Sequence, residues 1–300
     1  MKKILLALFP AALLTMPESS AQLSAYVPDP GVFEVTATYQ FQRYRDFWVG
    51  GTRISLETAT GFEVQQQHST FLTVEYGLLP GLAIDATVGH TWAEFKHGPG
   101  GVELDDDGLA DTSVGLRYRV IDERNHSAVP TFTIRFGGIA PGTYDDDFPF
   151  APGDGAGGFE ISALVAKQIL PGVGAYGEFG YRWRDHDVPE ELFGAAGVWA
   201  SYRGITFSVG YRQTESLDGP DIGDPGFGVD FGFPQTREID KRIESALGYT
   251  DSRGRYYGAF FSATFEGRNT GEKYIYGVNV SIPFGGGETP LPPPAYYGKK

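Results

Sequence analysis

The chain has 300 residues, with 24 Lys and Arg against 38 Asp and Glu, and a formal net charge of −14 at pH 7. This acidic balance argues against nucleic acid as a partner, because phosphate backbones are bound by clustered basic side chains. The chain has no Cys, which excludes disulfides and Cys-based metal sites and leaves burial and strand pairing to stabilise the fold.

The first 21 residues have the layout of a secretory signal peptide. Lys2 and Lys3 precede an apolar run at residues 4–14, and a small-residue cleavage site follows. We expect cleavage after Ala21, with Ala25 as the alternative. An uncleaved anchor is disfavoured, because the apolar run is too short to cross a membrane as a helix.

Beyond residue 21 no stretch approaches about 18 continuous apolar residues, so the sequence predicts no transmembrane helix. Its mean hydropathy is negative. A membrane protein of this composition is expected only as a β-barrel, in which half of each strand faces a polar interior.

Twelve segments alternate apolar and polar residues with the period of two that is typical of a strand with two different faces. In residues 273–284, Tyr274, Tyr276 and Val278 share one face, and Gly277 and Asn279 share the other. The predicted strands, in chain order, are residues 32–44, 67–76, 82–92, 111–121, 130–140, 159–168, 174–184, 192–202, 205–213, 238–249, 257–266 and 273–284. Only 238–249 is ambiguous, because it contains good helix formers; a strand is preferred because an all-strand chain needs a partner there.

The predicted connections alternate in length. Those after the second, fourth, sixth, eighth and tenth strands are short, whereas those after the first, third, fifth and ninth are long and acidic. Short periplasmic turns, long outer loops and an even strand count are typical of an antiparallel up-and-down barrel of a bacterial outer membrane. We therefore predict an all-β transmembrane barrel at residues 22–284, followed by a Pro/Gly-rich periplasmic tail at 285–300; a soluble β-sandwich is the alternative.

The inward phase of these strands collects charges of both signs, which in a narrow wet channel would set selectivity. Arg side chains there would hold carboxylate or phenolate groups well. The alternative is that Arg and carboxylate groups pair into a plug that fills the lumen. The predicted lumen selectivity residues are Arg117, Arg119, Arg135, Arg182, Arg184, Arg212, Glu178, Glu266 and Asp111.

Other candidate sites are weaker. The runs 105–107 and 145–147 are each three Asp residues in predicted outer loops, and clustered carboxylates can bind divalent cations; solvated runs are the commoner case. A lipid hydrolase is disfavoured, because His68 and Ser69 would point to opposite faces of a strand and His126 and Ser127 lie in a predicted periplasmic turn. We expect no catalytic residue, cofactor or metal.

The run from Gly108 to Arg119 resembles the outer-membrane family named for the meta-pathway of phenol degradation. The segments 138–142, 153–155 and 267–270 resemble it too. The resemblance implies an outer-membrane barrel that passes small, often aromatic, compounds, and the family offers no catalytic residues to transfer. The tail beyond Phe284 departs from barrels that end at a terminal Phe.

These observations predict a channel or transporter for passive uptake of small aromatic or anionic solutes across the outer membrane. A structural or receptor barrel with a plugged lumen is the alternative. The expected partners are outer-membrane lipid, lipopolysaccharide, the barrel-assembly machinery and the solute. The sequence does not identify the solute, the oligomeric state, or whether the residues after Gln22 fold into the lumen.

Overall fold

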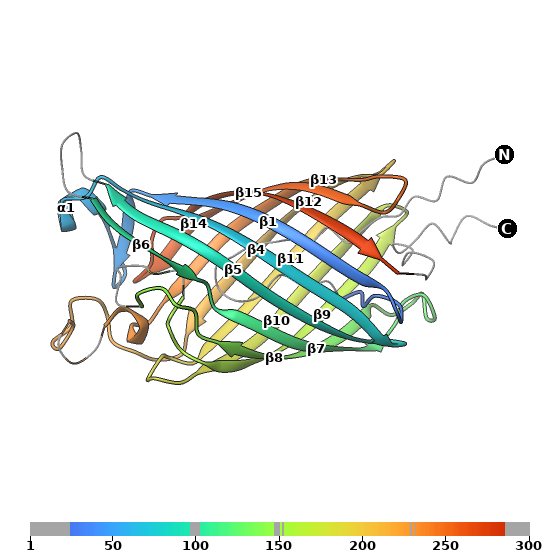
Figure 1. Ribbon diagram of the computed structural model, residues 1–300, viewed down its shortest axis with the longest axis horizontal. Helices are drawn as coiled ribbons and strands as arrows, with labels where there is room; N and C mark the ends of the chain where they lie inside the picture. The colour runs from blue at the N-terminus through green and yellow to red at the C-terminus, as the bar shows by residue number, and fades with distance from the viewer. Residues whose placement is uncertain are drawn as a thin grey trace.

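Twelve antiparallel strands close into a barrel, as the sequence predicts (Figure 1). The computed structural model describes residues 25–96, 103–146, 151, 153–228, 230 and 232–285. The predicted signal peptide and all of the predicted tail except Gly285 lie outside these residues and stay predictions. The barrel strands are β1 (Phe33–Tyr44), β4 (Val64–Leu79), β5 (Leu82–Lys96), β7 (Thr112–Ile121), β8 (Thr131–Ala140), β9 (Gly158–Leu170), β10 (Val173–Arg184), β11 (Glu191–Tyr202), β12 (Ile205–Ser216), β13 (Ile239–Thr250), β14 (Tyr256–Arg268) and β15 (Tyr274–Phe284).

The first and last strands close the barrel. β1 pairs along its length with β15, with Phe33 opposite Phe284 and Phe41 opposite Tyr276, and on its other side with β4. β4 continues to β5, so the sheet has no free edge between them. Closure matters because a lipid-exposed strand edge would leave backbone N–H and C=O groups unbonded.

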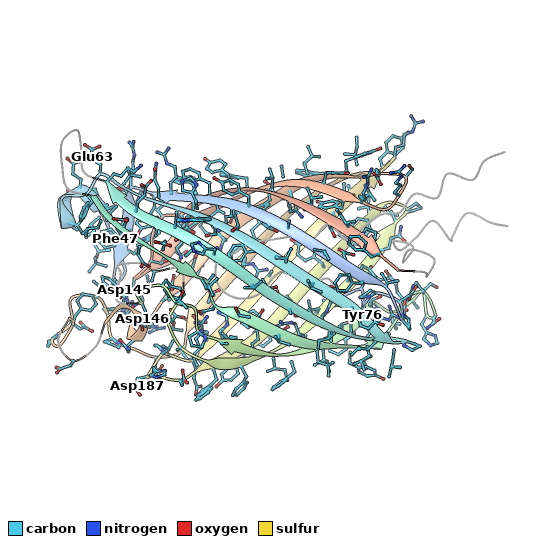
Figure 2. All side chains as sticks on the ribbon, in the orientation of Figure 1. Phe47, Glu63, Tyr76, Asp145, Asp146 and Asp187 are labelled. Atoms are coloured by element: carbon cyan, nitrogen blue, oxygen red, sulfur yellow. The ribbon has the colours of Figure 1, made fainter. Side chains whose placement is uncertain are left out.

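The two ends of the barrel differ. At the short-turn end, two-residue links such as Pro80–Gly81 and Arg203–Gly204 join neighbouring strands. At the long-loop end lie the connections 45–63, 97–111, 141–157 and 217–238. Figure 2 shows Tyr76 at the short-turn end, and Glu63, Phe47, Asp145, Asp146 and Asp187 at the opposite end. This is the alternation of loop lengths that the sequence predicts.

The long loops contain elements that period-two patterning did not reveal. The first holds a hairpin of β2 (Asp46–Val49) and β3 (Thr52–Ser55), followed by α1 (Leu56–Thr60). The second holds β6 (Glu103–Leu109), which extends the β5 ladder beyond the point where β7 leaves it. A short η1 (Phe233–Gln235) lies in the last long loop. The ambiguous segment 238–249 forms β13, as preferred above.

Outer and inner faces have opposite chemistry. On the outside, large apolar side chains are exposed along the strands, for example Phe136 at 57% and Phe179 at 61%. Aromatic pairs such as Phe33–Phe284 and Phe159–Trp183, with centroids 6.2 and 5.5 Å apart, lie towards the two ends. On the inside, Thr, Ser, Gln and charged side chains are buried. An apolar outer band flanked by aromatic residues is the surface that a bilayer selects.

Within the described ranges, no helix is long and apolar enough to cross a membrane.

The outward face gives a depth-dependent prediction. Val209 lies midway along β12, whereas Tyr202 lies at the short-turn end of β11. We expect Val209→Arg to lower the free energy of unfolding in lipid by about 2–4 kcal/mol, because a charge would face hydrocarbon, and Tyr202→Arg to lower it by about 1 kcal/mol or less. Urea unfolding in lipid vesicles measures both, and equal effects at the two depths would contradict the membrane-facing assignment.

Candidate functional site

The candidate site is the interior of the barrel, and most of the predicted selectivity residues point into it. Arg117, Arg135, Arg182, Arg184, Arg212 and Asp111 are each at most 4% exposed. Glu178 is also inward, where it pairs with Arg212. Arg119 lies at the short-turn end and pairs with Asp122 at 3.2 Å.

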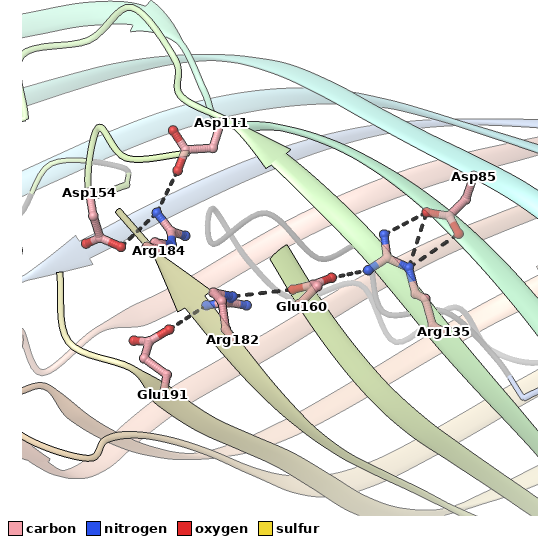
Figure 3. A network of polar contacts seen from close by, with 8 residues as sticks. All are labelled: Asp85, Asp111, Arg135, Asp154, Glu160, Arg182, Arg184 and Glu191. Atoms are coloured by element: carbon pink, nitrogen blue, oxygen red, sulfur yellow. Dashed lines mark hydrogen bonds and ion pairs between the residues drawn. The ribbon is translucent and has the colours of Figure 1, made fainter. Parts of the chain in front are cut away.

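A continuous chain of ion pairs runs from strand to strand along the inner wall of the barrel (Figure 3). Arg135 on β8 binds Asp85 on β5, with Nη2 2.8 Å from Oδ2, and also contacts Glu160 on β9. Glu160 in turn accepts from Arg182 on β10 at 3.3 Å, and Arg182 reaches Glu191 on β11 at 2.8 Å. Ion pairs between neighbouring charged side chains thereby link five strands.

Two glycines provide the space for this chain. A Cβ on Gly115 or Gly137, which face each other on β7 and β8, would lie 2.6 Å from the Arg135 guanidinium. The guanidinium therefore lies directly on the backbone of the barrel wall. A larger residue at either position would push Arg135 out of reach of its carboxylates.

A second group of charges ties a long loop to the wall. Arg184 Nη1 lies 2.9 Å from Asp111 Oδ2 and 2.8 Å from Asp154 Oδ2. Asp111 Oδ1 accepts hydrogen bonds from the Tyr144 hydroxyl at 2.6 Å and from the backbone N–H of Gly142 at 2.9 Å. Residues 142, 144 and 154 of the loop 141–157 are therefore held to the barrel wall at the long-loop end.

The remaining inward cations are paired as well. Arg117 contacts Glu75 and lies 3.7 Å from Asp85. Arg212 bridges Glu178 at 3.5 Å and Glu244 at 3.1 Å. Because paired buried charges compensate one another, the interior is a network of ion pairs and not a row of unopposed positive charge.

Glu266 does not lie in the lumen, so its predicted inward position is wrong. A register shift places Lys241 opposite Glu266 and Arg242 opposite Thr264, so Phe265 is the extra residue of a β-bulge. The bulge reverses the alternation, and Glu266 pairs with Lys241 on the outer surface with its side chain 59% exposed.

Glu160, Glu191 and Asp154 are lumen residues that sequence reasoning did not select. Glu160 alternates with the outward Phe159 and Ile161, and that alternation was the available signal. Glu191 precedes the predicted start of its strand, and Asp154 belongs to a loop. Neither position carries a periodic signal.

The N-terminal segment enters the lumen at the short-turn end. The Ala25 carbonyl accepts from Thr133 Oγ1 at 2.5 Å, the Val27 carbonyl accepts from Arg119 at 3.3 Å, and the Tyr26 hydroxyl donates to Glu123 at 2.7 Å. Ala25 packs against Leu164 and Ala166 inside the barrel. The sequence had left the position of these residues open.

A small cavity of about 60 Å³ lies at the long-loop end. A buried water needs roughly 10–15 Å³, so the cavity has room for only a few. Its lining includes Gln42, Gln67, Asp154, Glu191, Glu238 and Lys273. The cavity at the mouth is therefore small and lined by polar groups.

Asn269 joins three of the loops at this mouth. Its φ is 47°, a left-handed conformation that Asn tolerates. Its Oδ1 accepts from the N–H of Gly50 at 2.7 Å, and its Nδ2 donates to the Arg237 carbonyl at 2.7 Å and to Asp221 at 2.8 Å. Arg268 also bonds Asp221 through its Nε at 2.8 Å. Residues 268–269 thus hold the loop 217–238 over the mouth.

The acidic runs show no metal site. Asp106 Oδ2 accepts from the backbone N–H of Asp145 at 3.1 Å, so the two runs lie together. In the part of the chain that the structure describes, no group of three or more His, Asp or Glu side chains is arranged to hold a metal ion. Asp147 lies outside that part.

Comparisons with known proteins agree with this architecture. The model of the family described as "Putative MetA-pathway of phenol degradation" matches residues 22–234. No curated protein matches the chain.

Solved structures of outer-membrane barrels resemble the fold. An outer membrane channel from Pseudomonas putida F1 is 12% identical, with a TM-score of 0.63, over 92% of this chain and 100% of that chain. The translocator domain of autotransporter NalP from Neisseria meningitidis is 12% identical over 85% and 88% of the two chains, and the NanC porin is 11% identical over 83% and 98%. Both have TM-scores of 0.45, too low to support an argument. The first likeness shows a shared fold.

The Asp221 contacts predict a pH-dependent mouth. Burial raises the pKa of the Asp221 carboxyl, but the hydrogen bonds from Arg268 and Asn269 outweigh it, so this pKa lies below its usual value. The contact therefore stabilises the loop at neutral pH and is lost only as the pH falls below about 4, the ordinary pKa of Asp. We expect hydrogen–deuterium exchange of the loop 217–238 to increase there, after correction for intrinsic rates.

Asp221→Asn is the matched variant. It removes the charge at every pH, so its loop should exchange faster already at pH 7 and show little further change on acidification. A wild-type loop that exchanges equally at both pH values would contradict this role of Asp221.

Proposed function

The chain belongs to the family of the MetA pathway of phenol degradation, and we propose that it is an outer-membrane channel or transporter for passive uptake of small solutes. One observation carries this proposal: a closed sheet with an apolar exterior surrounds a lumen lined by buried polar and charged side chains. A polar interior does not contribute to the contact between the barrel and lipid, but it lowers the free-energy cost of moving a hydrated solute across the membrane. The fold shared with the Pseudomonas putida channel supports the same role.

The inward charges are proposed to set what passes. The proposed selectivity residues line the lumen, and Glu160 and Glu191 now belong to this set. Its other members are Arg117, Arg119, Arg135, Arg182, Arg184, Arg212, Glu178 and Asp111. Glu266 is removed, because it faces outward. Since the chain through Arg135 and Arg182 lies along the inner wall, its rearrangement would widen or narrow the path beside it.

The proposed location is the bacterial outer membrane. It follows from the predicted signal peptide at residues 1–21, the exposed apolar belt and the barrel fold. Lipid and lipopolysaccharide would surround the belt, and the barrel-assembly machinery would insert the chain. The short-turn end would face the periplasm, since short turns in such barrels lie there.

A plugged structural or receptor barrel is the second candidate, and it also has support. The Arg135–Arg182 chain fills space along one wall of the lumen, the segment 25–27 occupies the short-turn end, and the mouth cavity is small. A lipid hydrolase has less support. His68 packs against Phe41 on the outer face, with ring centroids 4.9 Å apart and the planes tilted by 42°, whereas Ser69 is buried inside.

Conductance separates the two leading candidates. We expect the purified protein to give discrete current steps in planar lipid bilayers, because the polar lumen provides a path for ions. Protein that is folded, as shown by heat-modifiable electrophoretic mobility, yet gives no step at any voltage would favour the plugged barrel.

Arg182→Gln tests the role of the charge chain. The substitution leaves Glu160 and Glu191 without one of their cations, so the lumen becomes more negative. We expect the reversal potential in a salt gradient to shift toward the cation equilibrium potential. Lys241→Gln, which removes a cation from the outer surface, is the control. Identical reversal potentials for the two variants would mean that Arg182 does not set selectivity.

A further inference from the structure

One wall of the lumen carries almost no charge. β15, β1 and β4 are adjacent strands (Figure 1). Most of their inward positions carry amide or hydroxyl groups from the mouth down to Glu34 and Glu75 at the short-turn end, while Phe71 of β4 and Ile275 of β15 are apolar inward residues. We call the five amides on this surface the amide wall, and they are Gln40, Gln42, Gln65, Gln67 and Asn279, each at most 4% exposed.

The amides follow one another along the barrel axis. Gln42 on β1 lies opposite Gln67 on β4, and Gln40 lies opposite Ser69. On the other side of β1, Thr38 lies opposite Asn279 of β15. The wall is therefore continuous across three neighbouring strands, from just below the mouth to the middle of the barrel.

Several amide atoms of this wall have no hydrogen-bond partner among the residues that the structure describes. They are Gln40 Nε2, Gln42 Oε1, both polar atoms of the Gln65 side chain, and Asn279 Nδ2. Burying an amide without a partner costs free energy, and buried polar groups in proteins are nearly always bonded. These side chains thus present unused donors and acceptors to the lumen.

The opposite wall differs in charge. Its carboxylates and guanidinium groups bond one another, as in the chain from Asp85 through Arg135 and Glu160 to Arg182, although single atoms such as Arg184 Nη2 and Glu244 Oε2 have no partner among the described residues. An anion bound along this chain would have to displace a carboxylate that already holds an Arg. A neutral molecule on the amide wall would disturb no ion pair.

The amide wall also begins at the mouth. Gln42 and Gln67 line the cavity at the long-loop end, so a solute held there contacts two amides of the wall. Deeper in the lumen, Phe260 of β14 lies over Gly277, beside the same wall. An apolar face next to free amides suits a solute that has both a hydrocarbon part and a hydrogen-bonding group.

We propose that the amide wall is the solute-binding path of the barrel, and that it takes small uncharged molecules bearing hydroxyl, carbonyl or amide groups. This inference rests on the proposed channel function and specifies its substrate class. Each amide along the wall offers such a group a hydrogen-bond donor or acceptor. These hydrogen bonds replace the ones to water that the solute loses on entering the lumen. The ion pairs of the opposite wall then keep the path narrow.

The test compares a neutral solute with ions in the same protein. Full-length protein is placed in lipid vesicles, and osmotic swelling measures the influx of erythritol, a small uncharged polyol. The variant Gln42→Met/Gln67→Met keeps side-chain length and removes the amides. We expect erythritol influx to fall about fivefold or more, the factor that one lost hydrogen bond gives, while potassium chloride conductance changes less than about twofold.

Gln66→Met is the matched control. Gln66 is next to Gln67 on β4 and points to the outer face, so both erythritol influx and conductance should equal those of the wild type. Gln40→Met, one step deeper on the wall, gives the same test if the double variant does not fold.

Three outcomes overturn the inference. Unchanged erythritol influx in the folded variant would show that the amides do not bind the solute. Equal losses of influx and conductance would indicate a general block of the lumen. A wild type with neither swelling nor conductance would overturn the channel function itself, and the inference with it.

Discussion

The structure depends on one constraint: a sheet in lipid must bond every backbone N–H and C=O group within itself. β1 meets this constraint by pairing with β15 on one side and β4 on the other, which closes the first strand against the last. Closure then divides every strand into two faces. Alternate residues must suit lipid outside and a confined polar space inside. On β10, Phe179 is exposed on the outer face and Arg182 is buried on the inner face.

The confined space decides how the inward charges behave. Arg135 and Glu160 are each at most 3% exposed, so neither can rely on water to solvate its charge, and each takes the other as a partner. Gly115 and Gly137 are part of this arrangement because they let the guanidinium lie against the wall. The same pairing engages most of the charged groups, whereas the amide wall keeps five amide atoms that have no hydrogen-bond partner among the described residues.

The two ends of the barrel are held by different contacts. At the mouth, Asn269 and Arg268 fasten neighbouring loops through side-chain hydrogen bonds to Asp221, an arrangement sensitive to charge. At the short-turn end, the backbone of Ala25–Val27 is held by Thr133 and Arg119. The run 267–270 is one of the segments that resemble the phenol meta-pathway family. It has a physical role, because its Arg268 and Asn269 hold the loops of the mouth together.

The period-two alternation of the sequence by itself determined the barrel, its twelve strands, the loop pattern and the inward phase of residues such as Arg135 and Arg182. A local repeat is sufficient for this, because neighbouring side chains of a strand point to opposite faces whatever the strand pairs with. Only the tertiary structure decided which carboxylate each Arg binds, that a bulge at Phe265 turns Glu266 outward, and that Ala25 lies inside the lumen. These depend on register between strands and on closure, which bring together residues far apart in the chain and leave no periodic signal in either segment.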